Sequence, residues 1–231
     1  MQKILSTLAL LAMAGLVQAE SAALLVYQVW ERGSAPYFTR ILVTDGHVRL
    51  DEGREGGDYT LYDRLSETAY SVSVEDRSVL VIAPRLGSVP ETNALILDEQ
   101  QSVDERAPMV AGKRPVSVTF LANGESCGSV VAVSGLMEHA LQGLRELRRV
   151  LARAHAATLT AQPGQFQAAC DLASDVHAPT RMLDHGLPLE ERSGGSTQLL
   201  IDFREHFDAQ PGLFVVPEDF GRLGMPSLPA A

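Results

Sequence analysis

Apolar and polar residues alternate in a succession of short runs along the first third of the chain. Val48 and Leu50, for example, alternate with His47, Arg49 and Asp51. Such alternation predicts β-strands with one apolar face. The predicted strands span residues 22–32, 37–44, 47–53, 58–64, 67–74 and 77–84. The links between them are short and either polar or glycine-containing, which favours an antiparallel meander because parallel strands need long crossovers.

The pattern changes in the second half of the chain, where helical spacing appears. The stretch 83–115 is predicted to be irregular, since it holds charges and prolines around one short apolar run. The later predicted elements are a strand at 116–122, a helix at 136–159, a short helix at 166–175 and strands at 187–193 and 197–207. The long helix is indicated by apolar residues that recur every three or four positions. We therefore expect one α+β domain over residues 20–231, with a helical insertion at about 136–178.

The side of the long helix opposite its apolar stripe carries four arginines, Arg145, Arg148, Arg149 and Arg153. Two explanations fit this stripe. The arginines form an anion-binding surface, or they form a solvated face that offsets the acidity of the remaining chain. We favour the solvated face, because charge on one side is normal in an amphipathic helix.

The N-terminus has the three parts of a secretory signal peptide: Lys3, an apolar stretch at 4–17 and a small-residue site ending at Ala19. The apolar stretch is shorter than the ~20 residues that span a bilayer. Cleavage after Ala19 would leave no membrane span and would give a periplasmic or secreted protein. The net charge of −10 becomes −11 without Lys3, and this acidity argues against nucleic acid as a partner.

Two cysteines, Cys127 and Cys170, are present in the exported part. An even pair in an oxidising compartment predicts a disulfide. It would close a loop of about forty residues and stabilise the fold by roughly 3–4 kcal/mol.

Residues 124–128, Gly-Glu-Ser-Cys-Gly, match the G-x-S-x-G pattern of serine hydrolases, with Ser126 in the nucleophile position. That motif needs a strand before the serine and a helix directly after it, whereas a β-branched run follows here. Asn123-Gly124 is instead a strong hairpin signal. We favour the hairpin and keep a hydrolase as an alternative. The histidines are scattered, and no metal or cofactor motif occurs, so we predict no catalytic residue, metal site or cofactor.

Several motifs of the meander resemble those of small exported bacterial domains near the lipoprotein-carrier (Lol-like) half-barrel group. The similar segments are Val48-Arg49-Leu50-Asp51, Tyr62-Asp63-Arg64, Tyr70-Ser71-Val72, Val79-Leu80-Val81-Ile82 and Gly212-Leu213-Phe214-Val215-Val216-Pro217. The resemblance covers a third to a half of the chain and is moderately specific. The helix at 136–159 and the cysteine pair depart from the carriers.

The resemblance implies a curved antiparallel sheet, a half-barrel, with helices on its concave side around an apolar cavity. It carries over no catalytic residue. We expect a periplasmic binding module for an apolar or acyl-bearing ligand, such as a lipid or an acylated protein. The expected lining is Tyr27, Ile41, Leu50, Leu61, Val72 and Val81. These residues could equally form a closed core, because apolar strand faces are often plain core. An envelope regulatory domain that binds a protein partner is the alternative function.

Overall fold

The computed structural model describes residues 19–54, 56–83, 95–161 and 168–224. The predicted leader lies outside the described residues except for Ala19. The strands are β1 Glu20–Glu31, β2 Tyr37–Val43, β3 His47–Asp51, β4 Tyr59–Asp63, β5 Thr68–Ser73, β6 Ser78–Ile82, β7 Leu97–Ser102, β8 Val116–Ala122, β9 Glu125–Val133, β10 Leu187–Ser193, β11 Ser196–Ala209 and β12 Gly221–Gly224. The helices are α1 Glu138–Ala161 and α2 Ala169–Leu172, with shorter helical turns at Ala173–His177, Arg181–Leu183 and Pro211–Phe214.

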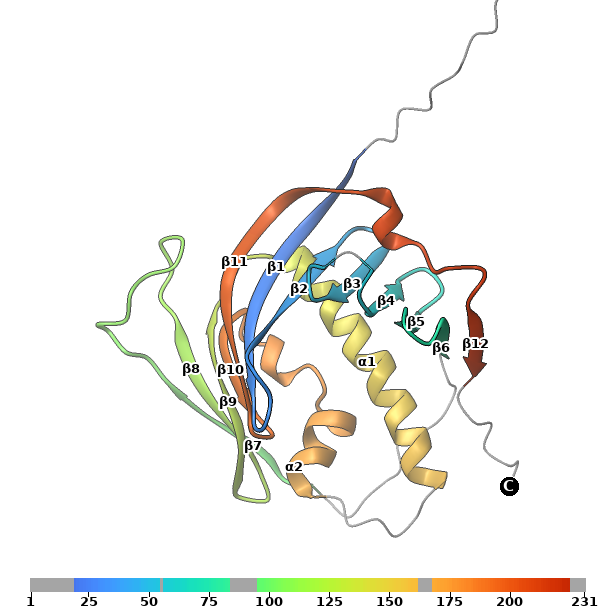
Figure 1. Cartoon of the computed structure of the whole chain (residues 1–231). Helices are drawn as coiled ribbons and strands as arrows, with labels where there is room; N and C mark the ends of the chain where they lie inside the picture. The colour runs from blue at the N-terminus through green and yellow to red at the C-terminus, as the bar shows by residue number, and fades with distance from the viewer. Residues whose placement is uncertain (1–18, 55, 84–94, 162–167, 225–231) are drawn as a thin grey trace, which may run out of the picture.

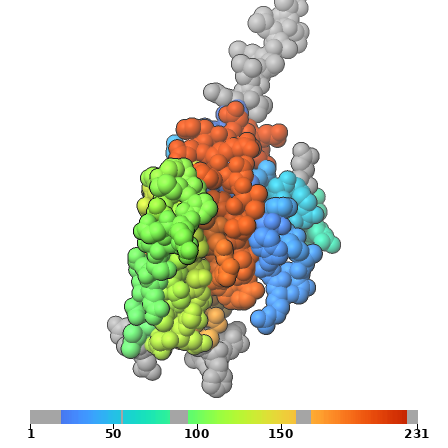
Figure 2. Space-filling model, turned by 90° about the vertical axis from the view of Figure 1, so that its left-hand side faces the viewer, coloured from blue at the N-terminus to red at the C-terminus, as the bar shows by residue number. Residues whose placement is uncertain are grey.

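All the described strands belong to one sheet, in the order β12-β6-β5-β4-β3-β2-β1-β11-β10-β9-β8-β7. The predicted antiparallel meander is confirmed in β1 to β6, and the pair β12–β6 is the parallel exception. The sheet is open, and it curves around α1 (Figure 1). Figure 2 shows its outer face, on which the neighbouring strands β7, β8, β9, β10, β11 and β1 lie side by side. Because helices are few, the chain is mainly β rather than evenly α+β. Residues 97–102, predicted to be irregular, form the edge strand β7.

The inner face of the sheet, which faces α1, carries the larger core. Leu25 and Val43 from the sheet are fully buried against Leu141 and Leu147 of the helix. Gly143 lets the helix approach, since a Cβ there would lie within 2.9 Å of side-chain methyl groups on β2 and β3. The apolar stripe predicted for this helix is therefore the surface that packs on the sheet.

The outer face is covered in part by the segment 211–216, which follows β11. Phe214 is buried there among Leu24, Leu42 and Leu61, and its ring stacks on His47 with centroids 5.7 Å apart. The chain then continues to β12 at the edge of β6. Both faces of the central strands are thus buried, one under α1 and one under the C-terminal segment.

The hairpin prediction at Asn123-Gly124 is confirmed. Both residues have positive φ, 52° and 81°, and they connect β8 to β9. Two successive residues in this conformation are typical of the tight turns that match strand twist. Ser126 consequently lies in β9, paired with Leu121. It does not lie at a strand-to-helix turn, so the arrangement that a nucleophile elbow requires is not formed around it.

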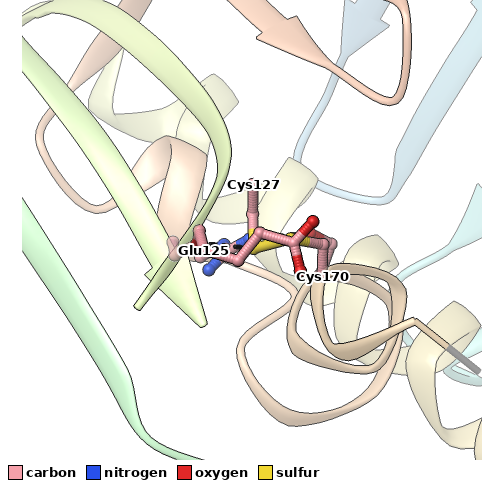
Figure 3. Close-up of a disulfide and its surroundings, with 5 residues drawn as sticks. Glu125, Cys127 and Cys170 are labelled. Atoms are coloured by element: carbon pink, nitrogen blue, oxygen red, sulfur yellow. Dashed lines mark hydrogen bonds between the residues drawn. A yellow bond between two sulfur atoms is a disulfide. The ribbon is translucent and has the colours of Figure 1, made fainter. Parts of the chain in front are cut away.

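The predicted disulfide is confirmed between Cys127 and Cys170, which join β9 to α2 across 43 positions (Figure 3). Such a bond fits an oxidising compartment. Within the described part of the chain, no helix combines the length and apolarity needed to cross a bilayer.

Candidate functional site

The six residues predicted to line one cavity lie on both faces of the sheet. Directly paired residues of an antiparallel ladder share a face. Ile41 pairs with Leu25 and Leu50, which places these side chains on the inner face. Tyr27 is on the same face, since it follows Leu25 by two positions. Each of these three contacts the core around α1.

The other three predicted residues, Leu61, Val72 and Val81, lie on the outer face. Leu61 packs with Leu24 and Phe214 in the outer core. Val81 pairs with Tyr70, which itself pairs with Leu61, so Val81 lies on the same face. The prediction of a single lining is therefore wrong, because the strand register pairs Leu50 with Thr60 and not with Leu61. Ligand binding by any of the six stays a prediction.

The inner face is not filled along its whole length by α1. Beside the C-terminal half of the helix lies a pocket of about 340 Å³. Its walls come from three elements: α1, the segment 173–183 that follows α2, and β10. The lining includes Arg148, Leu151 and Ala152 from α1, Ser174, Asp175, Arg181 and Met182 from the segment, and Glu191 and Ser193 from β10. This volume is at the small end of the range typical of ligand sites.

One wall of the pocket is an ion pair between α1 and β10. Arg148 Nη2 lies 3.2 Å and 3.4 Å from the two carboxylate oxygens of Glu191. The Gln198 side-chain amide also donates to Glu191. This carboxylate is buried, and each of its partners satisfies part of its hydrogen-bonding capacity. Of the arginine stripe, Arg148 thus has a definite partner in the sheet and is not a simple solvated residue.

Tyr27 lies close to this pair but does not line the pocket. Its hydroxyl donates to the carbonyl oxygen of Pro188 at 3.0 Å. Burial raises the pKa of this phenol well above its usual range, and the negative charge of Glu191 raises it further. Tyr27 therefore stays neutral and acts as a hydrogen-bond donor between the core and the pocket.

Arg181 is a buried charged residue of the pocket that forms no ion pair with the described residues. It is 7% exposed. Its Nη2 donates to Ser174 Oγ at 2.9 Å, and its guanidinium lies 5.2 Å from the centroid of the Phe120 ring. Its Nε is buried and has no hydrogen-bond partner in the described part of the chain. Burial lowers the pKa of Arg181 below the usual arginine range, although arginine remains protonated in proteins.

Two links hold the segment 173–183 in place over the sheet. Arg145 of α1 donates from Nη2 to the carbonyl oxygen of Leu183 at 2.5 Å and approaches Asp184 at 3.6 Å. The disulfide fixes α2, directly before the segment, to β9. Of the four arginines in the stripe, Arg148 thus forms part of the pocket wall and Arg145 holds the segment that forms another wall.

Other hollows of the molecule carry less distinctive chemistry. Leu50 and Val72 border a pocket of about 280 Å³ near the ends of β3 to β5. A pocket of about 420 Å³ near the start of α1 is bordered by His139 and His206. No group of three or more potential metal ligands occurs in residues 19–54, 56–83, 95–161 and 168–224.

The segment 173–183 was not predicted from the sequence to be part of a site. The signal available was weak, since Arg181 is a lone basic residue after Pro179. Comparison with known proteins adds no assignment: no protein-family model matches the chain, and no curated protein matches its sequence.

Proposed function

We propose that this protein is an exported binding module for an apolar or acyl-bearing ligand, related to lipids or lipoproteins. The observation that carries the proposal is the pocket beside α1. It combines apolar groups of Leu151, Ala152 and Met182 with a few buried polar side chains. Charged side chains of Arg148, Arg181 and Glu191 also line the pocket, and small-molecule sites combine apolar walls with placed polar groups of this kind.

Two further features support this proposal. The curved sheet around a helix is compatible with the resemblance to carrier half-barrels, and the disulfide fits a periplasmic or secreted protein. Because α1 fills the inner face over the first strands, the proposed ligand site is confined to the part of that face near β10. A short acyl chain is therefore a better candidate than a large lipid.

A fluorescent fatty acid tests the proposal, together with native mass spectrometry of the protein taken from its own envelope. Neighbouring residues of β10 offer a matched pair of variants. Ser193 lines the pocket and is exposed, whereas Arg192 faces the opposite side of the strand. Ser193→Trp should fill the pocket mouth and lower the affinity for the probe at least tenfold. Arg192→Trp should leave the affinity unchanged.

A clean apo mass and no uptake of the probe would contradict the binding function. Equal uptake by both tryptophan variants would contradict the location of the site. Both variants are at exposed positions, so their thermal unfolding should stay close to that of the wild-type protein.

A protein-interaction domain of the envelope is the second candidate function, and an apolar patch on the outer face favours it. Trp30, Phe38 and Leu199 are 37%, 50% and 38% exposed and surround Gln28 across three adjacent strands. A photocrosslinker at Phe38 should capture one defined protein, and Trp30→Ser should abolish the crosslink. A crosslinker at the exposed Leu65 is the control, and equal capture there would contradict a specific surface.

A further inference from the structure

Arg181 is a buried cation without a carboxylate partner. No acidic side chain of the described residues forms an ion pair with it. Of the five N–H donors of a guanidinium, one reaches Ser174 Oγ. The Phe120 ring offers a weak additional attraction at 5.2 Å. These contacts orient the side chain and leave its charge without a counter-ion.

The other charged groups at the pocket do not supply that counter-ion. Glu191 is bound by Arg148 and Gln198, so its charge is already matched. Asp175 also lines the pocket, but it is exposed to solvent and is not within ion-pair distance of Arg181. The buried guanidinium of Arg181 is therefore a positive charge in the pocket lining that no carboxylate of the described residues balances.

Burial of an unpaired charge is costly, and proteins normally compensate it with an opposite charge. A guanidinium is suited to carboxylates and phosphates, which it binds with two parallel hydrogen bonds. We propose that the ligand of this pocket carries an anionic group, a carboxylate or a phosphate ester, that pairs with Arg181. This inference rests on the proposed binding function and specifies the class of its ligand.

The walls next to Arg181 define the other part of the ligand. Met182 lies beside Arg181 in the chain, and Leu151 and Ala152 face the pocket from α1. An anionic head near Arg181 would therefore place an alkyl chain along these side chains. The expected ligand is a short anionic amphiphile.

Calorimetric titration of the full exported chain with four probes tests this inference. The probes are octanoate, octyl phosphate, octanol and inorganic phosphate. Octanoate or octyl phosphate should bind the wild-type protein at least tenfold more tightly than octanol does, and the preferred one of the two identifies the anionic group. Arg181→Met should remove the difference from octanol. Arg149→Met, which removes an exposed arginine from α1, should keep it.

Each other outcome has a definite meaning. Equal binding of octanol and both anionic amphiphiles would overturn the anion inference and leave the apolar binding function standing. Inorganic phosphate that binds as tightly as octyl phosphate, with loss in Arg181→Met, would support the anion site and overturn the apolar ligand. No binding of any probe would overturn both.

The titration does not depend on one substitution. If Arg181→Met fails to fold, the comparison of octanoate with octanol on the wild-type protein still decides the question. Arg181→Lys gives a further readout, because lysine keeps the charge and loses the planar pair of donors. Its preference for the anionic probes over octanol should lie between those of the wild-type protein and Arg181→Met. An unchanged preference in Arg181→Met would assign the anion to another residue and overturn the inference.

Discussion

Arg40 and Asp51 form a two-armed hydrogen-bonded pair across β2 and β3. Arg40 Nε and Nη2 each lie 2.8 Å from one carboxylate oxygen of Asp51. Arg49 donates to the same carboxylate at 2.5 Å, and it also donates to the Leu213 carbonyl oxygen at 2.6 Å. One buried carboxylate therefore holds two arginines, and one of them is connected to the C-terminal segment.

Asp51→Ala should destabilise the protein by about 3 kcal/mol, because it leaves the buried guanidinium of Arg49 without a carboxylate. Urea denaturation measures the change. Asp202→Ala is the control, since it removes one partner of the exposed pair with Arg204 and should cost less than about 1 kcal/mol. Equal effects of the two substitutions would contradict a structural role for the buried pair.

The stability of the fold should depend on the ionisation of Asp51. Burial alone would raise the pKa of this carboxyl, but hydrogen bonds from Arg40, Arg49 and the Gly53 N–H outweigh it and lower the pKa. The unfolded chain then binds protons more readily, so the contribution is present above about pH 4 and is lost as the pH falls further. The stability difference between the wild-type protein and Asp51→Asn should accordingly shrink below about pH 4. A constant difference down to pH 2 would contradict this assignment.

Removal of the disulfide should lower the free energy of unfolding by about 4 kcal/mol on the chain-entropy estimate, given the 43 positions between Cys127 and Cys170. Denaturation of the double serine variant checks this value. Thiol titration of the unfolded, unreduced protein should find no free thiol, and two free thiols would refute the bond. The variant should also bind the fluorescent fatty acid more weakly, because α2 and the segment after it would lose their covalent link to β9.

Phe214→Ala should cost about 3 kcal/mol, since it empties a buried aromatic site in the outer core. The next residue provides a matched control. Val215 is 57% exposed, so Val215→Ala should change stability by less than about 0.5 kcal/mol. If the two variants unfold at the same urea concentration, the C-terminal segment does not contribute to the core as described.

The strands and the long helix could be predicted because their apolar patterns are local. The face of the sheet on which each strand residue lies could not be predicted. Residues 22–25 are buried on both sides, so a continuous apolar run gives no information about which side faces the helix. The register from β3 to β4 then places Leu50 and Leu61 on opposite faces, and no local signal specifies that register.

The pocket was harder to predict than the sheet. Arg181 in the sequence is one arginine among many, and its significance depends on burial and on the lack of a carboxylate partner in the described structure. The disulfide was predictable from two cysteines and an export signal. Its connection to the pocket depends on the position of α2 beside β9, which only the fold reveals.

Titration of ¹⁵N-labelled protein with octanoate, followed by amide chemical shifts, tests the central claim most directly. We predict that the largest shifts occur at Ala152, Ser174 and Met182 around the pocket beside α1. The largest shifts at His139 and His206, near the start of the same helix, or no shifts at millimolar octanoate, would contradict the claim that this pocket is the binding site.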